Sequence, residues 1–324
     1  MKVVRRGLIY TAISYIAWGL SPAYWKLLLD VDLFTLVSHR MLWSFVFIII
    51  VVRFVCWSEF KTLIRNRRAL LILGMSGICV ASTWWLFIYA VNSGQVLQSS
   101  LGYYINPLMA IAAGVFFFHE KLTTLQKIAV ALATTGVLFF TIDYGSFPWL
   151  AISMALMFAI YGALKKKGGF APLPALAVET TLVAPVAIVF VIMSFFMPEN
   201  TLVADCASVD GWITLLLLVG GGLVTVLPLL WFAEGVNAIP LSWVGFLQFV
   251  APTLSLLLGV FAFGEAFTFA HAVCFAFIWL GLGLISIEFA RDARHNKGKA
   301  LGDDGKPKEM TGDNQTIESS HHAD

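Results

Sequence analysis

Two ionisable side chains lie inside long apolar runs of this sequence. Arg40 comes seven residues after the start of the run 33–55, and Glu179 comes six residues after the start of 173–196. A charge inside a bilayer costs about 2.5–3.5 kcal/mol, so each group would need a partner or a water-filled cavity there. Arg40 could neutralise a substrate carboxylate or another anion, and Glu179 could bind an amine or act as a proton-coupling group. The alternative is that both bind backbone groups and fix helix packing.

Polar and aromatic side chains form a second group of candidates. Ser99, Tyr103 and Asn106 are spaced by four and three residues in the run 97–118, so they share one helix face. Such a face, directed into a bundle, suits an amphipathic or aromatic solute. The alternative is that these side chains only link helices by hydrogen bonds. We predict substrate contacts from six residues: Trp18, Arg40, Asn92, Tyr103, Asn106 and Gln248.

Patterns for catalysis or metal binding are not found in the sequence. The four cysteines form no Cys-x-x-Cys pair, and neither HExxH nor the phosphate-binding GxxxxGK[ST] pattern occurs. His39 could relay protons near neutral pH, or it could be a hydrogen-bonded structural histidine. Because histidine and aspartate are scarce in the apolar runs, we expect no catalytic residues, no enzyme activity, no metal and no cofactor. ATP is then not the direct energy source.

The composition places the chain in a membrane. Of its 324 residues, 59% are hydrophobic and 12% are charged, whereas soluble proteins are typically about 45–50% apolar and about 25% charged. This excludes an ordinary soluble enzyme, and a net charge of +2 gives no reason to expect nucleic acid as a partner. We expect a multi-pass protein whose partners are the lipid bilayer and a small molecule.

Ten apolar runs are long enough to cross a bilayer, which takes about 20 residues of helix. They lie at roughly 7–27, 33–55, 69–91, 97–118, 126–142, 147–163, 173–196, 211–233, 241–263 and 269–289. The fold class predicted is therefore an all-α membrane protein with ten transmembrane helices.

The basic residues predict how these helices are oriented. All of the 21 lysines and arginines except Lys26 and Arg40 fall at the N-terminus, in the tail, or in connections on the same side of the membrane. Because such residues are retained in the cytoplasm, we predict that both termini are cytoplasmic. The lysines at 165–167 are interpreted as part of this topology signal. The polar segment 291–324 has no apolar period and is predicted to be a disordered cytoplasmic tail.

The sequence also repeats itself at a distance of 145 residues. The matched pairs include proline, glycine and glutamate at co-linear positions: Pro107 with Pro252, Gly114 with Gly259, Glu120 with Glu265, and Gly136 with Gly281. The halves 1–145 and 146–290 each hold five predicted helices, an odd number, so they would enter the membrane from opposite sides. Inverted repeats are typical of alternating-access transporters.

Two of the repeated residue types have a predicted structural role. Pro107 and Pro252 each remove a backbone hydrogen bond near the middle of a long run, and we interpret both as hinges. The alternative is that they only shape helix packing. Glu120 and Glu265 stand at the ends of two predicted helices, where we expect each to cap or orient the next helix.

Several stretches resemble a known family. They are AYWKLL at 23–28, SHRMLWS at 38–44, WLFIYAVNSGQVLQSSLGYYINPL at 85–108, VETTLVAPVA at 178–187 and FLQFVAPTL at 246–254. In these stretches the sequence resembles the RarD family of the drug/metabolite transporter superfamily, which has two EamA-type five-helix repeats. The resemblance spans residues 7 to 290 and implies a ten-helix permease of the inner membrane.

These observations together predict a secondary transporter of small metabolites or drugs. It would export its substrate by alternating access, with proton exchange or by facilitated diffusion. The alternatives are a membrane channel, an uncoupled facilitator or an intramembrane enzyme. A pore-lining ring of charge, which favours a channel, is not seen in the sequence.

Overall fold

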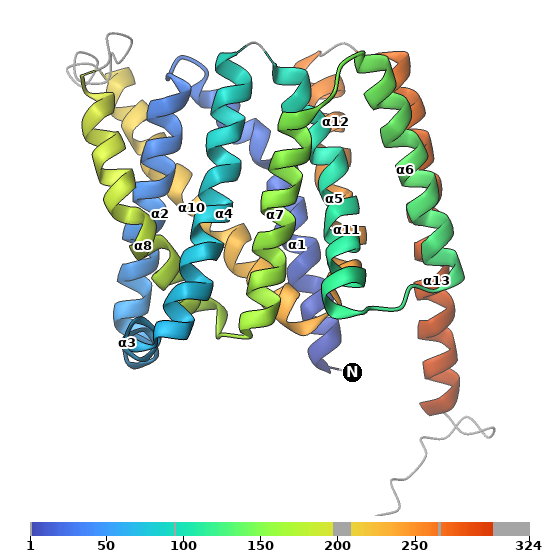
Figure 1. Cartoon of the computed structure of the whole chain (residues 1–324). Coiled ribbons are helices and arrows are strands. Elements are labelled where there is room, and N and C mark those ends of the chain that lie inside the picture. The colour runs from blue at the N-terminus through green and yellow to red at the C-terminus, as the bar shows by residue number, and fades with distance from the viewer. Residues whose placement is uncertain (1, 94, 197–208, 265–266, 301–324) are drawn as a thin grey trace, which may run out of the picture.

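The computed structural model describes all residues except 1, 94, 197–208, 265–266 and 301–324. The described residues form helices joined by short links and contain no strand, so the expectation of an all-α membrane protein is confirmed (Figure 1). The helices are, in chain order, α1 (Lys2–Trp25), η1 (Lys26–Leu28), α2 (Leu33–Val55), α3 (Trp57–Arg65), α4 (Arg67–Asn92), α5 (Val96–Phe118), α6 (Thr124–Tyr144), α7 (Trp149–Gly168), α8 (Pro172–Ser194), α10 (Val209–Ala238), α11 (Leu241–Gln248), α12 (Val250–Leu257), η2 (Leu258–Ala262) and α13 (Phe269–Ala300).

Within the described part of the chain, nine helical stretches are long and apolar enough to cross a membrane. The first helix, α1, is 24 residues long but is not one of the nine. Its sequence is interrupted by Thr11, Ser14 and Tyr15, all of which are buried inside the bundle. The hydroxyl of Ser14 donates to the carbonyl of Pro228 at 2.8 Å. Ten membrane crossings therefore stay a prediction, with α1 as the crossing still to be tested.

The ends of the helices are defined by local capping. The Asp32 carboxylate accepts a hydrogen bond from the Thr35 amide at 2.9 Å at the start of α2, and Thr123 and Gln126 form a reciprocal capping box on α6. Gly169 ends α7 with a positive φ of 59°, a conformation that costs glycine little. These caps matter because unpaired backbone groups are expensive beside a bilayer.

A short helix, α3, lies between α2 and α4 and was not among the elements expected from the sequence. Its Phe60 is buried, and its Lys61 and Arg65 are exposed. The ring of Trp57 stacks on that of Phe60 with centroids 5.1 Å apart. At nine residues and with one apolar face, α3 is too short to cross a membrane.

The two repeated prolines have different surroundings. The helix α5 is continuous through Pro107, whereas the run 241–263 is divided into α11, α12 and the π-helical turn η2. The division falls at Phe249, three residues before Pro252. A proline at 252 cannot donate a hydrogen bond to the carbonyl of Gln248, which accounts for a break at this point. The hinge role of both prolines stays a prediction.

Helices from the two halves of the sequence pack against one another. The helix α1 packs on α10, α4 on α7, α2 on α8, and α6 on α13, while α5 contacts both α7 and α11. Figure 1 shows α6 and α13 side by side at one edge of the bundle, and the N-terminus at the same end of the bundle as α3.

The last helix is longer than the sequence suggested. The segment expected to be disordered begins at residue 291, but α13 continues to Ala300. A helix can extend past its apolar part because each backbone amide still finds its acceptor four residues earlier. The rest of the predicted tail, 301–324, lies outside the described residues.

Glycines allow α6 and α13 to approach closely. A methyl group on Gly136 would lie 2.9 Å from the carbonyl oxygen of Cys274, and one on Gly281 would lie 3.0 Å from that of Ala129. Both positions are buried, whereas Gly283 on α13 has nothing within 4 Å of the same methyl position. The two helix backbones are therefore in contact at two points.

Leucine at Gly136 or Gly281 is expected to lower the free energy of unfolding by about 1–3 kcal/mol, because the added side chain overpacks a closed contact. Leucine at Gly283 is the matched control and should change it by less than about 0.5 kcal/mol. Unfolding of the purified protein in detergent measures all three variants. Equal stability of the Gly281 and Gly283 variants would contradict the close contact.

Candidate functional site

A buried ion pair joins α7 to α8. The Lys165 ammonium nitrogen lies 2.8 Å from Glu179 Oε2, and the two side chains are only 4% and 2% exposed. The hydroxyl of Ser76 on α4 donates to the other carboxylate oxygen at 2.7 Å. Glu179, predicted to need a partner, thus has a cation on one oxygen and a hydroxyl on the other. Because desolvating two charges is costly, such a pair is weak support for stability alone and raises the question of a function.

Aromatic rings connect this ion pair to two of the predicted substrate residues. Lys165 Nζ lies 5.6 Å from the centroid of the Tyr161 ring, and the Tyr161 ring stacks on that of Phe232 at 5.6 Å. Trp18 lies 5.8 Å from Phe232. The predicted residue Trp18 is therefore one ring away from the tyrosine beside the ion pair.

Gln248 joins the same cluster through α1. The Tyr15 hydroxyl donates to Gln248 Oε1 at 3.2 Å, and the Tyr15 and Trp18 rings are 5.5 Å apart. Both Tyr15 and Gln248 are buried. The structure therefore brings Trp18 and Gln248, separated by 230 positions in the sequence, into one aromatic and polar cluster.

Arg40 forms a separate centre between α2 and α10. Its guanidinium carbon lies 4.4 Å from the centroid of the Trp25 ring and 5.3 Å from that of Trp84. Its Nε donates to the hydroxyl of Thr225 at 3.1 Å. Among the described residues, no carboxylate lies within ion-pair distance of Arg40. The guanidinium is thus held by rings and one hydroxyl, with donors left for an anion.

The other predicted residues lie at different depths. Tyr103 is 52% exposed and interacts electrostatically with Arg40. His39 is buried, and neither of its ring nitrogens has a hydrogen-bond partner among the described residues. The same holds for the buried Oδ1 atom of Asn106. The side chain of Asn92 lies outside the described residues. The structure therefore groups Tyr103 with Arg40.

Comparison with known proteins identifies the family. Residues 5–142 match the EamA-like transporter family. The chain is 39% identical over 298 residues to the uncharacterised transporter YojE of Bacillus subtilis, covering 90% of this chain and 97% of that protein. It is 35% identical over 289 residues to the protein RarD of Escherichia coli, covering 89% and 96%. The chain belongs to the RarD family of EamA-type transporters.

A solved crystal structure has the same fold. It superposes with a TM-score of 0.68 over 87% of this chain and 97% of the other, at 17% sequence identity. At that identity the similarity concerns the fold alone. As a RarD family member, the protein is a multi-pass membrane transporter, and its family is one of transporters rather than enzymes.

Sequence reasoning missed several residues of these centres. Lys165 was interpreted as a topology signal, but it is buried and paired, and only Lys167 of the three lysines is exposed. Ser76 and Thr225, the hydroxyl partners of Glu179 and Arg40, carried no signal because serine and threonine are common in membrane helices. The spacing of four between Tyr161 and Lys165, which places both on one helix face, was a usable clue.

Glu120 caps a helix from the other half of the chain. Its carboxylate accepts hydrogen bonds from the Leu241 and Ser242 amides at 2.7 and 2.8 Å, at the start of α11. Lys166 lies 3.5 Å from the same carboxylate and donates to the carbonyl of Ile239 at 2.7 Å. Glu120 was expected to cap or orient the following helix, α6; the capping part is wrong, because α6 is already capped by Thr123. Glu265, its repeat partner, lies outside the described residues.

This junction makes part of the stability depend on pH. Burial acts to raise the pKa of Glu120, but the hydrogen bonds from Ser242 and Leu241 and the Lys166 ammonium outweigh it, so the pKa lies below its ordinary value. The ionised carboxylate stabilises the folded state fully above the ordinary glutamate pKa of about 4.3. This stabilisation is lost as the pH falls through the lower pKa of the folded state. Acid should therefore weaken the contact between α5 and α11.

Glu120→Gln is expected to remove this acid-sensitive part of the stability, because glutamine carries no charge to lose. Thermal unfolding measured from about pH 7 to about pH 3 should show a smaller decrease for the variant than for the wild type. Glu59→Gln, at an exposed position on α3, is the matched control and should keep the wild-type decrease. An identical pH profile for Glu120→Gln and the wild type would contradict the role of the junction.

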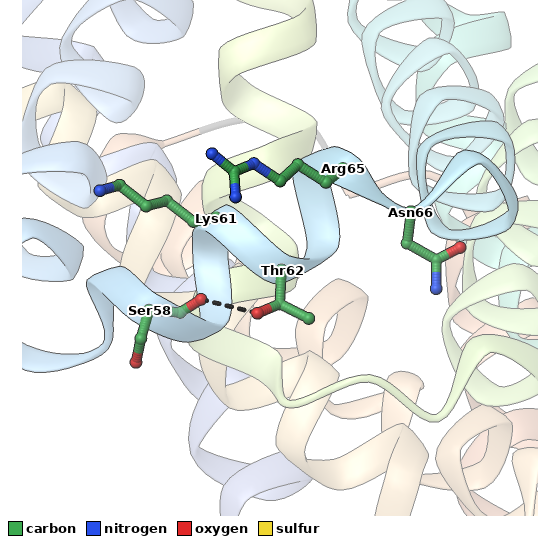
Figure 2. Close-up of a pocket in the computed structure, with 5 residues that line it drawn as sticks. All are labelled: Ser58, Lys61, Thr62, Arg65 and Asn66. Carbon is green, nitrogen blue, oxygen red and sulfur yellow. Dashed lines mark hydrogen bonds between the residues drawn. The ribbon is translucent and has the colours of Figure 1, made fainter.

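A hollow of about 550 Å³ lies on the polar face of α3. Figure 2 shows its lining side chains, which all come from this helix and the residue after it: Ser58, Lys61, Thr62, Arg65 and Asn66. The hydroxyl of Thr62 donates to the Ser58 carbonyl at 2.9 Å. None of the predicted substrate residues lines this hollow, so it is separate from the centres at Arg40 and Glu179.

Proposed function

We propose that this protein is a secondary transporter that exports small metabolites or drugs by alternating access, in exchange for protons. The observation that carries the proposal is the Lys165–Glu179 pair, buried in the bundle of a transporter with Ser76 as its third member. An ionisable carboxylate at this depth is expensive and therefore favours a functional role.

Protonation of Glu179 would change the energy of this site. In the ionised pair the two charges cancel, whereas a proton on Glu179 leaves the Lys165 ammonium buried without an anion. A buried unpaired charge is strongly unfavourable. Proton binding would therefore favour a conformation in which the ammonium reaches water, which couples the proton to alternating access.

The Arg40 centre supports an anionic group on the substrate. Its guanidinium has no carboxylate partner among the described residues and is flanked by Trp25 and Trp84. Arginine binds carboxylates and phosphates through two parallel hydrogen bonds. Tyr103, half exposed and electrostatically coupled to Arg40, adds an aromatic surface. We infer that the substrate class is an aromatic or amphipathic anion, with the Trp18–Gln248 cluster as a second contact region.

Mirrored contacts support the two inverted halves at 1–145 and 146–290. Gly136 contacts Cys274, and Gly281 contacts Ala129. Each residue of the second contact is shifted by 145 positions from its counterpart in the first, the same spacing as the sequence repeat. A pseudo-two-fold axis between α6 and α13 would produce such a pair of contacts.

The basic residues support an inner-membrane orientation with both termini in the cytoplasm. The exposed Lys61 and Arg65 of α3 lie at the same end of the bundle as the N-terminus. Such residues are retained on the cytoplasmic side. Export would then carry the substrate away from this face.

The proposal is tested with the purified protein in proteoliposomes. A thermal-shift screen of amino acids, aromatic metabolites and antibiotics identifies a solute that binds the protein. The uptake of this solute is then measured with and without a pH gradient. Glu179→Gln should abolish pH-driven uptake but retain counterflow exchange. Glu288→Gln, which changes a carboxylate of α13 outside the ion pair, is the matched control.

Two results would overturn the proposal. Unchanged pH-driven transport by Glu179→Gln would exclude this carboxylate as the coupling group. Currents far above the turnover of a carrier would instead favour a channel.

A further inference from the structure

A small cavity lies directly beside the buried ion pair. Its volume is about 10 Å³, and it lies where the ends of α4, α7, α8 and α10 meet. In Figure 1 the link between α7 and α8 is at the same end of the bundle as the N-terminus. The cavity is lined by Leu73, Lys165, Phe170, Pro172, Ala175, Ala233 and Asn237.

Two of the residues that line the cavity, Lys165 and Asn237, carry polar groups. Lys165 is buried and its ammonium carries three N–H groups, of which the Glu179 carboxylate at 2.8 Å can take only part. Asn237 is exposed, and its amide nitrogen donates to the Phe170 carbonyl at 2.9 Å, which leaves its amide oxygen as an acceptor. A cavity of this volume accommodates about one water molecule, which needs at least two polar partners.

The polar and ionisable groups around the pair come from several helices. Tyr161, on the same helix as Lys165, interacts electrostatically with Glu179, and α4 contributes the hydroxyl of Ser76. Lys166, next to Lys165 on α7, pairs with Glu120 from the link between α5 and α6. The helix α10 lines the cavity with Ala233 and Asn237, which do not titrate, and carries Glu234 between them.

We propose that this cavity holds a water molecule between Lys165 and Asn237 and is the route by which Glu179 exchanges its proton with the solution on that side. Lys165 passes one proton to the Glu179 carboxylate and becomes a neutral amine. The cavity water then donates a proton to this amine and is itself reprotonated from the solution. The net result is one proton moved from the solution to Glu179, with Lys165 again an ammonium. The inference rests on the proposed proton-coupling role of Glu179.

The test follows the protonation of Glu179 directly and needs no substrate. A light-triggered acid lowers the pH around the purified protein, and time-resolved infrared spectroscopy records the carboxyl band that is absent from Glu179→Gln. Ala233→Val fills the cavity and should slow the appearance of the band by about tenfold or more, the effect of losing one hydrogen bond to a charged group. Ala187→Val, an equally buried position on α8 away from the cavity, should keep the wild-type rate.

A second variant keeps the inference testable if Ala233→Val does not fold. Asn237→Leu removes this polar lining group at an exposed position and should slow the appearance of the same band, whereas Asn237→Gln should keep much of the wild-type rate. Wild-type rates in both Ala233→Val and Asn237→Leu would overturn the cavity route and leave the proposed function intact. Absence of any Glu179 band in the wild type would overturn the proposed coupling as well.

Discussion

Replacing Lys165 by methionine is expected to lower the free energy of unfolding by about 3–5 kcal/mol, the cost of leaving one buried charge without its partner. Glu179 is 2% exposed, and Lys165 is its ion-pair partner at 2.8 Å. The loss should shrink as the pH is lowered, because a protonated Glu179 carries no unpaired charge. Unfolding of the purified protein in mixed micelles at several pH values measures both effects.

The controls separate this pairing from a general effect of lysine. Lys167→Met changes an exposed residue of the same run and should alter the free energy of unfolding by less than about 0.5 kcal/mol. The double variant Lys165→Met/Glu179→Met should recover most of the lost stability, since an apolar pair of similar volume often replaces a buried ion pair without loss. Equal stability of the Lys165→Met and Lys167→Met variants would contradict the buried pair.

Replacing Arg40 by glutamine is expected to weaken the binding of anionic solutes by about 2–5 kcal/mol, because the solute's charge would then be buried without a partner. Arg40→Lys should lower the affinity for anionic solutes by an intermediate amount. It keeps the charge but loses the hydrogen bond from Nε to Thr225 and the planar contact with Trp25. Thermal shifts with aromatic carboxylates, compared with those of the corresponding alcohols, measure the charge-dependent part of the binding free energy.

Arg53→Gln is the matched control, because Arg53 is an exposed arginine on the same helix. It should leave the affinity for carboxylates at the wild-type value. Equal affinity for carboxylates in the Arg40→Gln variant and the wild type would remove Arg40 from the substrate site. The result does not depend on the coupling ion, so it tests the anion site separately from Glu179.

The helices could be predicted from the sequence because a bilayer restricts the choice. Backbone groups cannot stay unpaired in hydrocarbon, so each apolar run of about 20 residues must be helical. The amphipathic helix α3 was missed because its nine residues carry charge and fall between two such runs. The last turns of α13 were missed for a related reason, since a polar sequence gives no apolar period there.

Arg40 and Glu179 could be singled out because an ionisable group in an apolar run is rare and expensive. Their partners Lys165, Ser76 and Thr225 could not be identified from the sequence. The choice of Lys165 rather than Lys167 as the buried lysine depends on the rotation of α7 against α8, which adjacent lysines do not encode. Likewise, Glu120 reaches the start of α11 because helix packing brings it there, 121 positions away in the chain.

By itself, the sequence determined that this is a helical membrane protein of the RarD family with two ionisable groups in its apolar runs. Composition, apolar length and family motifs are properties of the chain, so they need no coordinates. Only the tertiary structure decided that Glu179 is paired with Lys165 and Ser76, while Arg40 has rings and Thr225 around it but no acid among the described residues. The reason is that a partner depends on which helix faces meet, and contacts between distant helices are set by packing.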